Sequence, residues 1–293
     1  MSMARPITAS TTVCAVIGNP VGHSLSPEIH NAAFGHLDLD WIYAAFRVED
    51  LQSAIAGIRA LGIRGVSVTI PHKVAALPFL DSIDATAQKI GAINTIVNTG
   101  GLLHGVNTDG AGALKALIEA GNDPAGTTVL IMGSGGAARA IAFTLADSAP
   151  PARLAIAGIL PDELSALCAD IAGRTAIAPV AIPLAPATLA AELEKARILI
   201  NCTPQGMHPA TGASPVAAEL LGERHVVFDI VYNPLTTRLL QEAESRGARI
   251  IRGIEMFLNQ AILQFELWTG HEAPAAVMRE VLIKKLSASG PPS

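Results

Sequence analysis

The sequence predicts an α/β protein of two domains that contains a doubly wound parallel sheet. Its 293 residues are enough for about two domains of ordinary size. Half of the residues are hydrophobic and only 4% are aromatic, so the apolar mass comes from the aliphatic residues of packed helices and buried parallel strands. Short apolar runs alternate with segments of helix length, which is typical of a doubly wound sheet. The composition excludes intrinsic disorder, a collagen-like fibre and a disulfide scaffold.

Charge and cysteine content restrict the partners. Lys plus Arg number 20 against 25 Asp plus Glu, a formal charge of -5, and no dense basic run occurs, so we expect no nucleic-acid partner. The three cysteines are far apart and form no CxxC pair, which predicts neither a disulfide nor a metal site and fits a reducing cytoplasm. No apolar run has the length of a signal peptide or a membrane span, so we expect a cytoplasmic protein without a membrane partner.

The first part of the chain is predicted to alternate strands and helices. We expect strands at residues 13–17 and 41–48, followed by helices that begin at Ser26 and Glu49. The apolar side chains of the second helix recur at helical spacing: Leu51, Ile55, Ile58 and Leu61.

A third strand, residues 65–70, leads to a candidate catalytic residue, Lys73. Ser67 and Thr69 alternate with apolar side chains along it, which predicts one core face and one face of hydroxyl groups. Pro71 stops ladder pairing just before Lys73, as in a strand that leaves its sheet to line a cleft. A lysine in phase with the two hydroxyls can exchange a proton with a substrate hydroxyl. A solvated lysine at a strand end explains the same pattern.

Asp109 is a second candidate catalytic residue. It belongs to a hinge-like stretch, residues 107–110, before a helix at about 110–120 that ends in the breaker residues 121–124. Asp109 is either the cap or turn residue before this helix or a buried carboxylate that pairs with Lys73.

A glycine-rich loop in the second half indicates a Rossmann-type dinucleotide-binding domain. A buried strand at 127–132 runs into Gly133, Gly135 and Ala138, which have the G-x-G-x-x-A spacing and precede a helix. Small residues allow a tight turn, close approach of the backbone to a pyrophosphate, and phosphate binding by the N–H groups at the helix start. A plain tight turn is the alternative, but the flanking strand and helix favour the dinucleotide site.

Further apolar runs at 154–157, 198–200 and 226–231 continue the sheet, and helices are expected at about 254–268 and 276–286. The strand at 154–157 is followed by Gly-Ile-Leu, so neither the acid that selects NAD nor the base that selects NADP stands at the expected place.

Two other groups have a structural and a functional interpretation. Ser26 is expected to cap the helix that has Pro27 at its first position, and the same helix start attracts a substrate carboxylate. Gln260 lies in line with an apolar stripe, where its amide bonds either the backbone or a substrate hydroxyl. Three histidines without ligand spacing are assigned to packing or surface roles: His23, His30 and His72.

Taken together, these segments resemble the shikimate dehydrogenase family over nearly the whole chain. The blocks that carry the resemblance occur in the family's order: GNP at 18–20, HSLSP at 23–27, VTIPHK at 68–73, GAINT at 91–95, NTDG at 107–110, the glycine loop, NCTPQGM at 201–207, DIVY at 229–232, and residues 253–260.

The resemblance implies reversible, NADP-linked reduction of 3-dehydroshikimate to shikimate in aromatic amino-acid biosynthesis, by a monomer or homodimer. It implies a substrate-binding catalytic domain, residues 1–108 plus 257–293, and a Rossmann domain, residues 109–256. Lys73 and Asp109 would act at the reacting oxygen. The implied substrate contacts are Ser24, Ser26, Ser67, Thr69, Asn94, Asp109, Tyr232 and Gln260. The implied cofactor contacts are Gly133, Ser134, Gly135, Gly136, Ala137, Ile230 and Gly253.

Two positions depart from the family pattern. Many relatives have Asn where this chain has Ser67, so a hydroxyl replaces an amide contact. The family's Asn-Arg-Thr block, whose arginine pairs with the 2′-phosphate of NADP, corresponds to Gly158-Ile159-Leu160, which makes NAD or dual use an alternative. Arginine at position 159 is predicted to lower the KM for NADP.

Two other functions stay open from the sequence. One is an NAD-dependent quinate/shikimate dehydrogenase that runs in the oxidative direction, with an aminoshikimate dehydrogenase as a further relative. The other is a non-catalytic sensor of shikimate or a nucleotide, against which Lys73 and Asp109 argue, because a sensor needs no proton-transfer pair.

Overall fold

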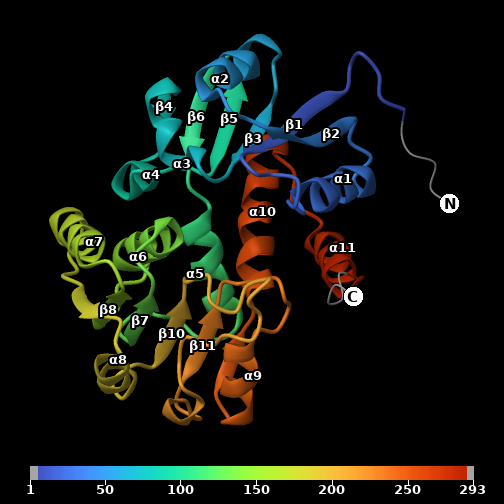
Figure 1. Cartoon of the computed structure of the whole chain (residues 1–293). Helices are drawn as coiled ribbons and strands as arrows, with labels where there is room; N and C mark the ends of the chain where they lie inside the picture. The colour runs from blue at the N-terminus through green and yellow to red at the C-terminus, as the bar shows by residue number, and fades with distance from the viewer. Residues whose placement is uncertain (1–5, 289–293) are drawn as a thin grey trace. The chain divides into compact units, whose positions relative to one another are not determined.

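The computed structural model describes residues 6–288, and the chain divides into two compact units (Figure 1). The first unit comprises Met1–Thr108 and Gln260–Ser293, and the second comprises Asp109–Asn259. Each unit is built on its own six-stranded sheet. The α/β class and the two-domain organisation predicted from the sequence are confirmed.

The sheet of the first unit is mixed. Its strand order is β2-β1-β3-β5-β6-β4, in which β1, β2 and β3 are parallel, β5 is antiparallel to both β3 and β6, and β4 is parallel to β6. Its elements are β1 Thr12–Gly18, α1 Ser26–His36, β2 Trp41–Arg47, α2 Leu51–Ala60, β3 Gly65–Val68, α3 His72–Ala75, β4 Ser82–Ile83, α4 Ala85–Ile90, β5 Thr95–Thr99, β6 Leu102–Val106 and α11 Ala275–Ala288. A short 3-10 helix spans Leu77–Phe79.

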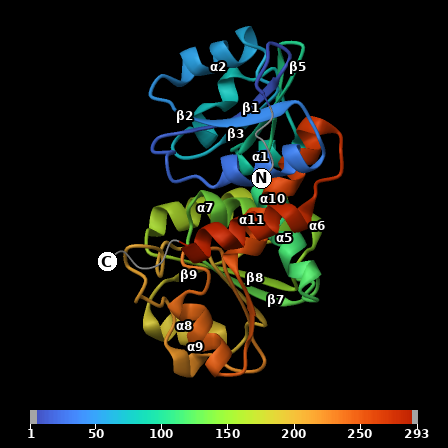
Figure 2. The ribbon, with the colours of Figure 1, turned by 90° about the vertical axis from the view of Figure 1, so that its right-hand side faces the viewer.

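The sheet of the second unit is entirely parallel, with the strand order β12-β11-β10-β7-β8-β9. Its helices cover both faces, with α5, α6 and α7 on one side of the strands and α8 and α9 on the other (Figure 2). The predicted doubly wound sheet is therefore confirmed. Its elements are α5 Asp109–Glu119, β7 Thr128–Met132, α6 Gly136–Ser148, β8 Arg153–Gly158, α7 Pro161–Arg174, β9 Val180–Pro183, α8 Pro186–Leu193, β10 Ile198–Asn201, β11 Val226–Asp229, α9 Arg238–Ser245 and β12 Arg249–Ile251. A second 3-10 helix spans Ala218–Leu220, and α10, Gly253–Thr269, runs across the division at residue 260.

The β5–β6 hairpin was not expected from the sequence. Its turn is Gly100-Gly101, and both residues have positive φ, 60° and 91°. Two-residue hairpin turns of this kind require positive φ at both central positions, which glycine adopts without strain. The hairpin gives the first unit its antiparallel strands.

Three local expectations were wrong. Leu61 does not join the buried stripe of α2 and is 77% exposed, because the helix ends at Ala60. The helix end is a Schellman motif, in which the amide of Gly62 donates to the Arg59 carbonyl and the amide of Ile63 donates to the Ile58 carbonyl. Ser26 is not the helix cap, as described below. The strand predicted to extend to residue 70 ends at Val68.

Each unit has its own apolar core. In the first unit it lies between α2 and the sheet, from Leu51, Ile55 and Ile58 to Val66, Ile93 and Ile96. In the second unit it includes Leu130, Met132, Leu189, Leu199 and Val227. Within residues 6–288 no helix is both long and apolar enough to cross a membrane.

Candidate active site

The carboxyl ends of β1 and β3 lie close together in the first unit. The amide of Thr69 donates to the Ile17 carbonyl at 3.0 Å, and the amide of Asn19 donates to the Ile70 carbonyl at 2.9 Å. A Cβ on Gly18 would overlap the methyl group of Thr69, so this approach depends on glycine. Thr69 therefore lies beside the segment that leads to Ser24 and Ser26.

Ser24, and not Ser26, supplies a hydroxyl to the start of α1. The Ser24 Oγ accepts the Ser26 amide at 3.3 Å, Ser26 is the first helical residue, and Leu25 precedes it without a side-chain cap. The sequence predicts the cap at Ser26 with Pro27 as the first helical residue, but the helix begins one residue earlier, at Ser26. Ser26 is buried at this helix N-terminus, where partial positive charge favours an anion.

Lys73 belongs to the four-residue helix α3 and not to the continuation of β3, so its expected phase with Ser67 and Thr69 was wrong. The backbone turns at Thr69, whose carbonyl accepts the amide of the buried His72 at 2.9 Å. The His72 Nε2 bonds the Val48 carbonyl, also at 2.9 Å, and this anchors α3. The Lys73 carbonyl accepts the Ile93 amide at 2.9 Å, so Lys73 lies next to the segment that carries Asn94.

Asn94 joins β3, β5 and the residues before the second unit. It is buried, and its Oδ1 accepts the Thr108 amide at 2.8 Å and the Thr95 hydroxyl at 2.7 Å. Its Nδ2 donates to the Thr108 Oγ1 at 2.9 Å, and its carbonyl accepts the Val68 amide at 2.8 Å. Thr108 also donates from its hydroxyl to the Gln260 carbonyl at 3.3 Å, which places Gln260 in the same group.

The Ser67 hydroxyl takes part in an internal chain of hydrogen bonds. It accepts the Tyr43 hydroxyl at 2.6 Å and donates to the Gln264 Oε1 at 2.8 Å. The Gln264 Nε2 in turn donates to the Thr95 Oγ1 at 2.9 Å. Burial raises the pKa of Tyr43, opposed by its hydrogen bonds to Ser67 and Ser26. Of the two hydroxyls expected on one face of this strand, that of Ser67 is therefore buried and bonded internally, whereas Thr69 is half-buried.

Sequence reasoning missed Tyr43 and Gln264. Tyr43 lies at the buried centre of β2, and Gln264 stands four residues after Gln260 on the same face of α10. A polar residue repeated at this spacing within a helix of apolar residues was the signal that could have identified Gln264.

The glycine loop of the second unit is exposed at Gly135 and Gly136. Gly133 has a φ of 106°, and its amide donates to the Ala157 carbonyl at 2.7 Å. A Cβ on Gly135 or Gly136 would meet no atom within 4 Å, so packing inside the protein does not demand glycine at either position. Ala138 is buried where α6 meets the sheet. This geometry fits the pyrophosphate of a dinucleotide, held by the amides at the start of α6.

Ile230 and Gly253 also lie close together in the second unit. A Cβ on Gly253 would clash with the carbonyl oxygens of Ile230 and Val231, so the start of α10 approaches this segment only because residue 253 is glycine. The ring of Tyr232 packs on Phe257 with centroids 4.8 Å apart, and burial raises the pKa of Tyr232.

The predicted substrate residues divide between the units. Asp109 and Tyr232 belong to the second unit, and the first unit contains Ser24, Ser26, Ser67, Thr69, Lys73, Asn94 and Gln260. Asp109 is the first residue of α5. The next residue, Gly110, packs so tightly on α6 that a Cβ would clash with Thr144 and Ala140. Among the described residues no cluster of three His, Cys, Asp or Glu could hold a metal ion.

A parallel sheet whose first strand runs through a G-x-G-x-x-A loop into a helix defines a dinucleotide-binding protein. Comparison with known proteins gives the family. Residues 16–96 match the model of the shikimate dehydrogenase substrate binding domain, and residues 253–283 match that of the shikimate 5'-dehydrogenase C-terminal domain. The shikimate dehydrogenase (NADP(+)) of Moorella thermoacetica is 46% identical over 97% of this chain and 96% of its own length.

Two crystal structures extend the comparison. A shikimate dehydrogenase in complex with NADP+ has a TM-score of 0.90 and 41% identity, and the match covers 97% of this chain and 99% of that chain. The shikimate 5-dehydrogenase of Listeria monocytogenes, in complex with shikimate and NAD, has a TM-score of 0.90 and 35% identity over 96% and 99% of the two chains. The chain belongs to the shikimate dehydrogenase family.

Proposed function

We propose that this protein is a shikimate dehydrogenase that reversibly reduces 3-dehydroshikimate to shikimate with a nicotinamide dinucleotide, in the biosynthesis of aromatic amino acids. The observation that carries the proposal is the match of nearly the whole chain to a curated NADP-dependent shikimate dehydrogenase at 46% identity. NADP is the cofactor named for that relative and for one of the similar crystal structures.

In this proposal the first unit binds the substrate and the second binds the dinucleotide. The glycine loop, Ser134, Ile230 and Gly253 would line the cofactor, whose nicotinamide supplies the hydride. Ser24 and Ser26 would hold the substrate carboxylate at the N-terminus of α1. The hydroxyls and amides of Thr69, Asn94, Tyr232 and Gln260 would contact the rest of the substrate. Ser67, whose hydroxyl is engaged by Tyr43 and Gln264, would act by positioning these neighbours and not by direct contact.

Lys73 and Asp109 are proposed to act at the reacting oxygen. As hydride reaches the carbonyl carbon, the oxygen gains negative charge, and the Lys73 ammonium donates a proton to form the hydroxyl. Asp109 would accept a hydrogen bond from the Lys73 ammonium, or from the substrate hydroxyl, and would thereby orient the proton transfer. In shikimate oxidation, neutral Lys73 would remove the hydroxyl proton while hydride leaves the carbon.

The test is the initial rate of shikimate oxidation by the purified protein, with quinate as the alternative substrate and NADP+ or NAD+ as the oxidant. We expect turnover of shikimate, and we expect Lys73→Ala to lower kcat by about 10²–10⁴, the usual contribution of general acid–base catalysis. Lys284→Ala, an exposed lysine of α11, is the matched control and should retain the parent rate. Loss of less than a fewfold in Lys73→Ala would contradict the assigned role.

The other outcomes of this assay separate the competing functions. Turnover of quinate with NAD+ in preference to shikimate would assign the protein to quinate oxidation. Binding of shikimate and dinucleotide with no turnover would indicate a sensor.

The three cysteines are free thiols, which supports the proposal that the protein acts in the reducing cytoplasm. A monomer or homodimer is proposed, and light scattering of the purified chain tests it.

A further inference from the structure

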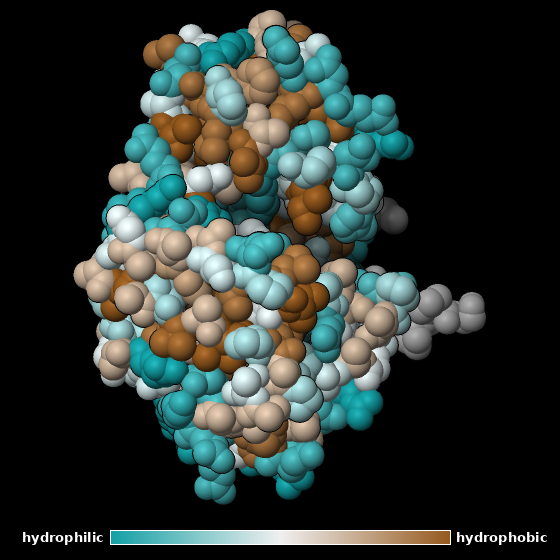
Figure 3. Space-filling model, turned by 60° about the vertical axis from the view of Figure 1, so that its left-hand side comes forward, coloured by the Kyte–Doolittle hydropathy of each residue, from teal (hydrophilic) through white to brown (hydrophobic). Residues whose placement is uncertain are grey.

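The corner of the second unit where β8 ends is expected to receive the adenosine ribose of a dinucleotide. In a doubly wound sheet the ribose nearest the adenine lies at the end of the second strand of the βαβ unit, and the group found there reads its 2′ position. That strand is β8, which ends at Gly158. The next two side chains, Ile159 and Leu160, are 74% and 54% exposed and carry no polar group. Figure 3 turns forward a face of the second unit on which apolar residues reach the surface.

A carboxylate, and not a cation, contacts the glycine loop at this corner. The Ser134 hydroxyl donates to the Glu163 Oε1 at 2.8 Å. The position of a Cβ on Gly158 would be 3.2 Å from the Ser134 Oγ and 3.4 Å from the Leu164 Cβ. Ser134, the end of β8 and the first turn of α7 therefore meet at one point, and Glu163 provides its negative charge.

The cations of the surrounding elements are paired elsewhere. α6, β8 and α7 carry one arginine each: Arg139, Arg153 and Arg174. The guanidinium of Arg139 is 2.7 Å from Asp170 and lies 5.0 Å from the centre of the Phe143 ring, and Arg174 is 3.7 Å from Asp170.

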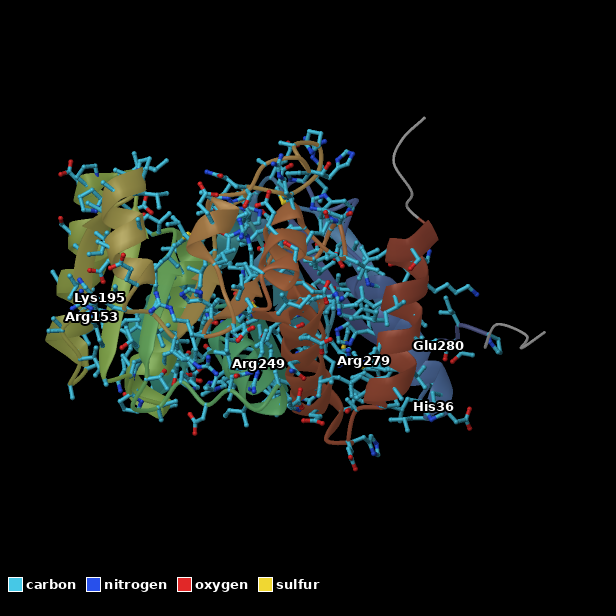
Figure 4. All side chains as sticks on the ribbon, turned by 90° about the horizontal axis from the view of Figure 1, so that it is seen from below. His36, Arg153, Lys195, Arg249, Arg279 and Glu280 are labelled. Carbon is cyan, nitrogen blue, oxygen red and sulfur yellow. The ribbon has the colours of Figure 1, made fainter. Side chains whose placement is uncertain are left out.

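Arg153 begins β8 and is roughly 16 Å from its other end, at about 3.3 Å per residue. It lies next to Lys195 (Figure 4), and both bond the buried Glu192 at 2.8 Å. The dinucleotide fits the open glycine loop, whereas a 2′-phosphate does not fit the residues at the end of β8.

We infer that Glu163 accepts a hydrogen bond from the adenosine ribose hydroxyls and disfavours a 2′-phosphate, so that this protein binds NAD+ at least as tightly as NADP+ and uses both. The Glu163 carboxylate accepts the Ser134 hydroxyl, and because this partner is uncharged the contact does not offset its negative charge. A ribose hydroxyl can donate to Glu163, whereas a phosphate dianion there meets a like charge. The use of both cofactors in turnover rests on the proposed dehydrogenase function, whereas the binding preference is a property of the second unit alone.

The test is isothermal titration of the full-length protein with NAD+ and NADP+, and with AMP and adenosine 2′,5′-bisphosphate, which differ only in the 2′-phosphate. We expect each 2′-phosphorylated compound to bind no more tightly than its partner. Glu163→Gln should lower the Kd of NADP+ severalfold and leave that of NAD+ equal or raised. Ile159→Arg should lower the Kd of NADP+ by about ten- to a hundredfold, as expected for a new charge-assisted hydrogen bond. Asp162→Asn, the exposed neighbouring acid, is the matched control and should change the ratio little.

A parent protein that binds NADP+ more tightly than NAD+ would overturn the inference, as would a Glu163→Gln variant whose ratio equals that of the parent. Because the titration contains no shikimate, it is independent of catalysis. A protein that shows the expected binding ratio but oxidises shikimate with neither cofactor would refute the proposed function and leave the binding preference standing.

Discussion

His30 is an unusual residue of the first unit, because it is fully buried and neither ring nitrogen has a hydrogen-bond partner. Its ring stacks on that of Tyr43, with centroids 4.6 Å apart and planes 10° from parallel, and it lies among Phe34, Phe265 and Trp268. Burial lowers the pKa of His30 to about 3. The packing role assigned to it from the sequence agrees with this environment.

His30 should make the protein sensitive to mild acid. The pKa in the native state is about 3, below the ordinary value of 6.5, so the unfolded chain binds a proton between these values while the native state does not. Stability therefore falls as the pH drops below about 6.5, by up to about 1.4 kcal/mol per pH unit. Urea unfolding at pH 7 and pH 5 measures the loss.

His30→Leu should lose less stability between these two values than the parent, while His36→Leu, a change at an exposed histidine of α1, should lose as much as the parent. Equal losses in the parent and in His30→Leu would show that other groups, such as carboxylates, account for the acid sensitivity.

Asp229 connects the ends of two neighbouring strands of the second unit, β10 and β11. It ends β11 and is fully buried, and its carboxylate accepts the Thr237 hydroxyl at 2.6 Å, the Asn201 Nδ2 at 2.9 Å and the Val231 amide at 3.1 Å. Burial raises the pKa of Asp229 and these hydrogen bonds oppose the shift. Thr237 is the cap of α9, so one carboxylate fixes the ends of β10 and β11 and the start of α9.

Asp229→Asn should destabilise the second unit by about 1–3 kcal/mol, because one of its three donors would face the new amide group and remain unsatisfied. Since Asp229 precedes Ile230, the substitution should also weaken NAD+ binding. Denaturant unfolding and calorimetric titration measure the two effects. Asp123→Asn, at an exposed turn of the same unit, is the control. Unchanged stability would mean that the carboxylate contributes no more than an amide does.

The sequence predicts the elements whose periodicity is strong and fails where a long-range contact sets the boundary. The inner parallel strands β7, β8, β10 and β11 are continuous apolar runs, and the glycine loop is a fixed spacing of small residues, so local sequence is sufficient to find them. The short edge strands β9 and β12 were not predicted. The end of β3 and the turn that places Lys73 in α3 depend on contacts with residues 17 and 19 of β1 and the segment after it. The Ser67 hydroxyl is covered by Tyr43 and Gln264, which are 24 and 197 residues away in the chain, and no local pattern reveals such contacts.

The two units have separate cores, so their stabilities should respond to different changes. In the first unit, Gly65 of β3 lies against the Trp268 indole, whose Nε1 donates to the Ile96 carbonyl at 3.1 Å. A methyl group on residue 65 would overlap that ring, and overpacking of this kind costs about 1–3 kcal/mol. The second unit carries the glycine loop, so a dinucleotide stabilises that unit through binding.

Scanning calorimetry tests whether the units unfold separately. With NAD+ or NADP+ at about 100 times its Kd, the native second unit gains about 2.7 kcal/mol, because ligand binds only the folded state. Gly65→Ala should lower the transition of the first unit and leave the increment caused by the dinucleotide unchanged. Gly173→Ala lies in the exposed last turn of α7, where a Cβ meets no atom. It should leave the first transition in place and raise the free energy of unfolding of the second unit by about 0.5–1 kcal/mol, the usual gain on replacing a helical glycine. A single transition that moves with all three changes would show that the two cores unfold together, and the stability of the dinucleotide site would then depend on the packing around Trp268.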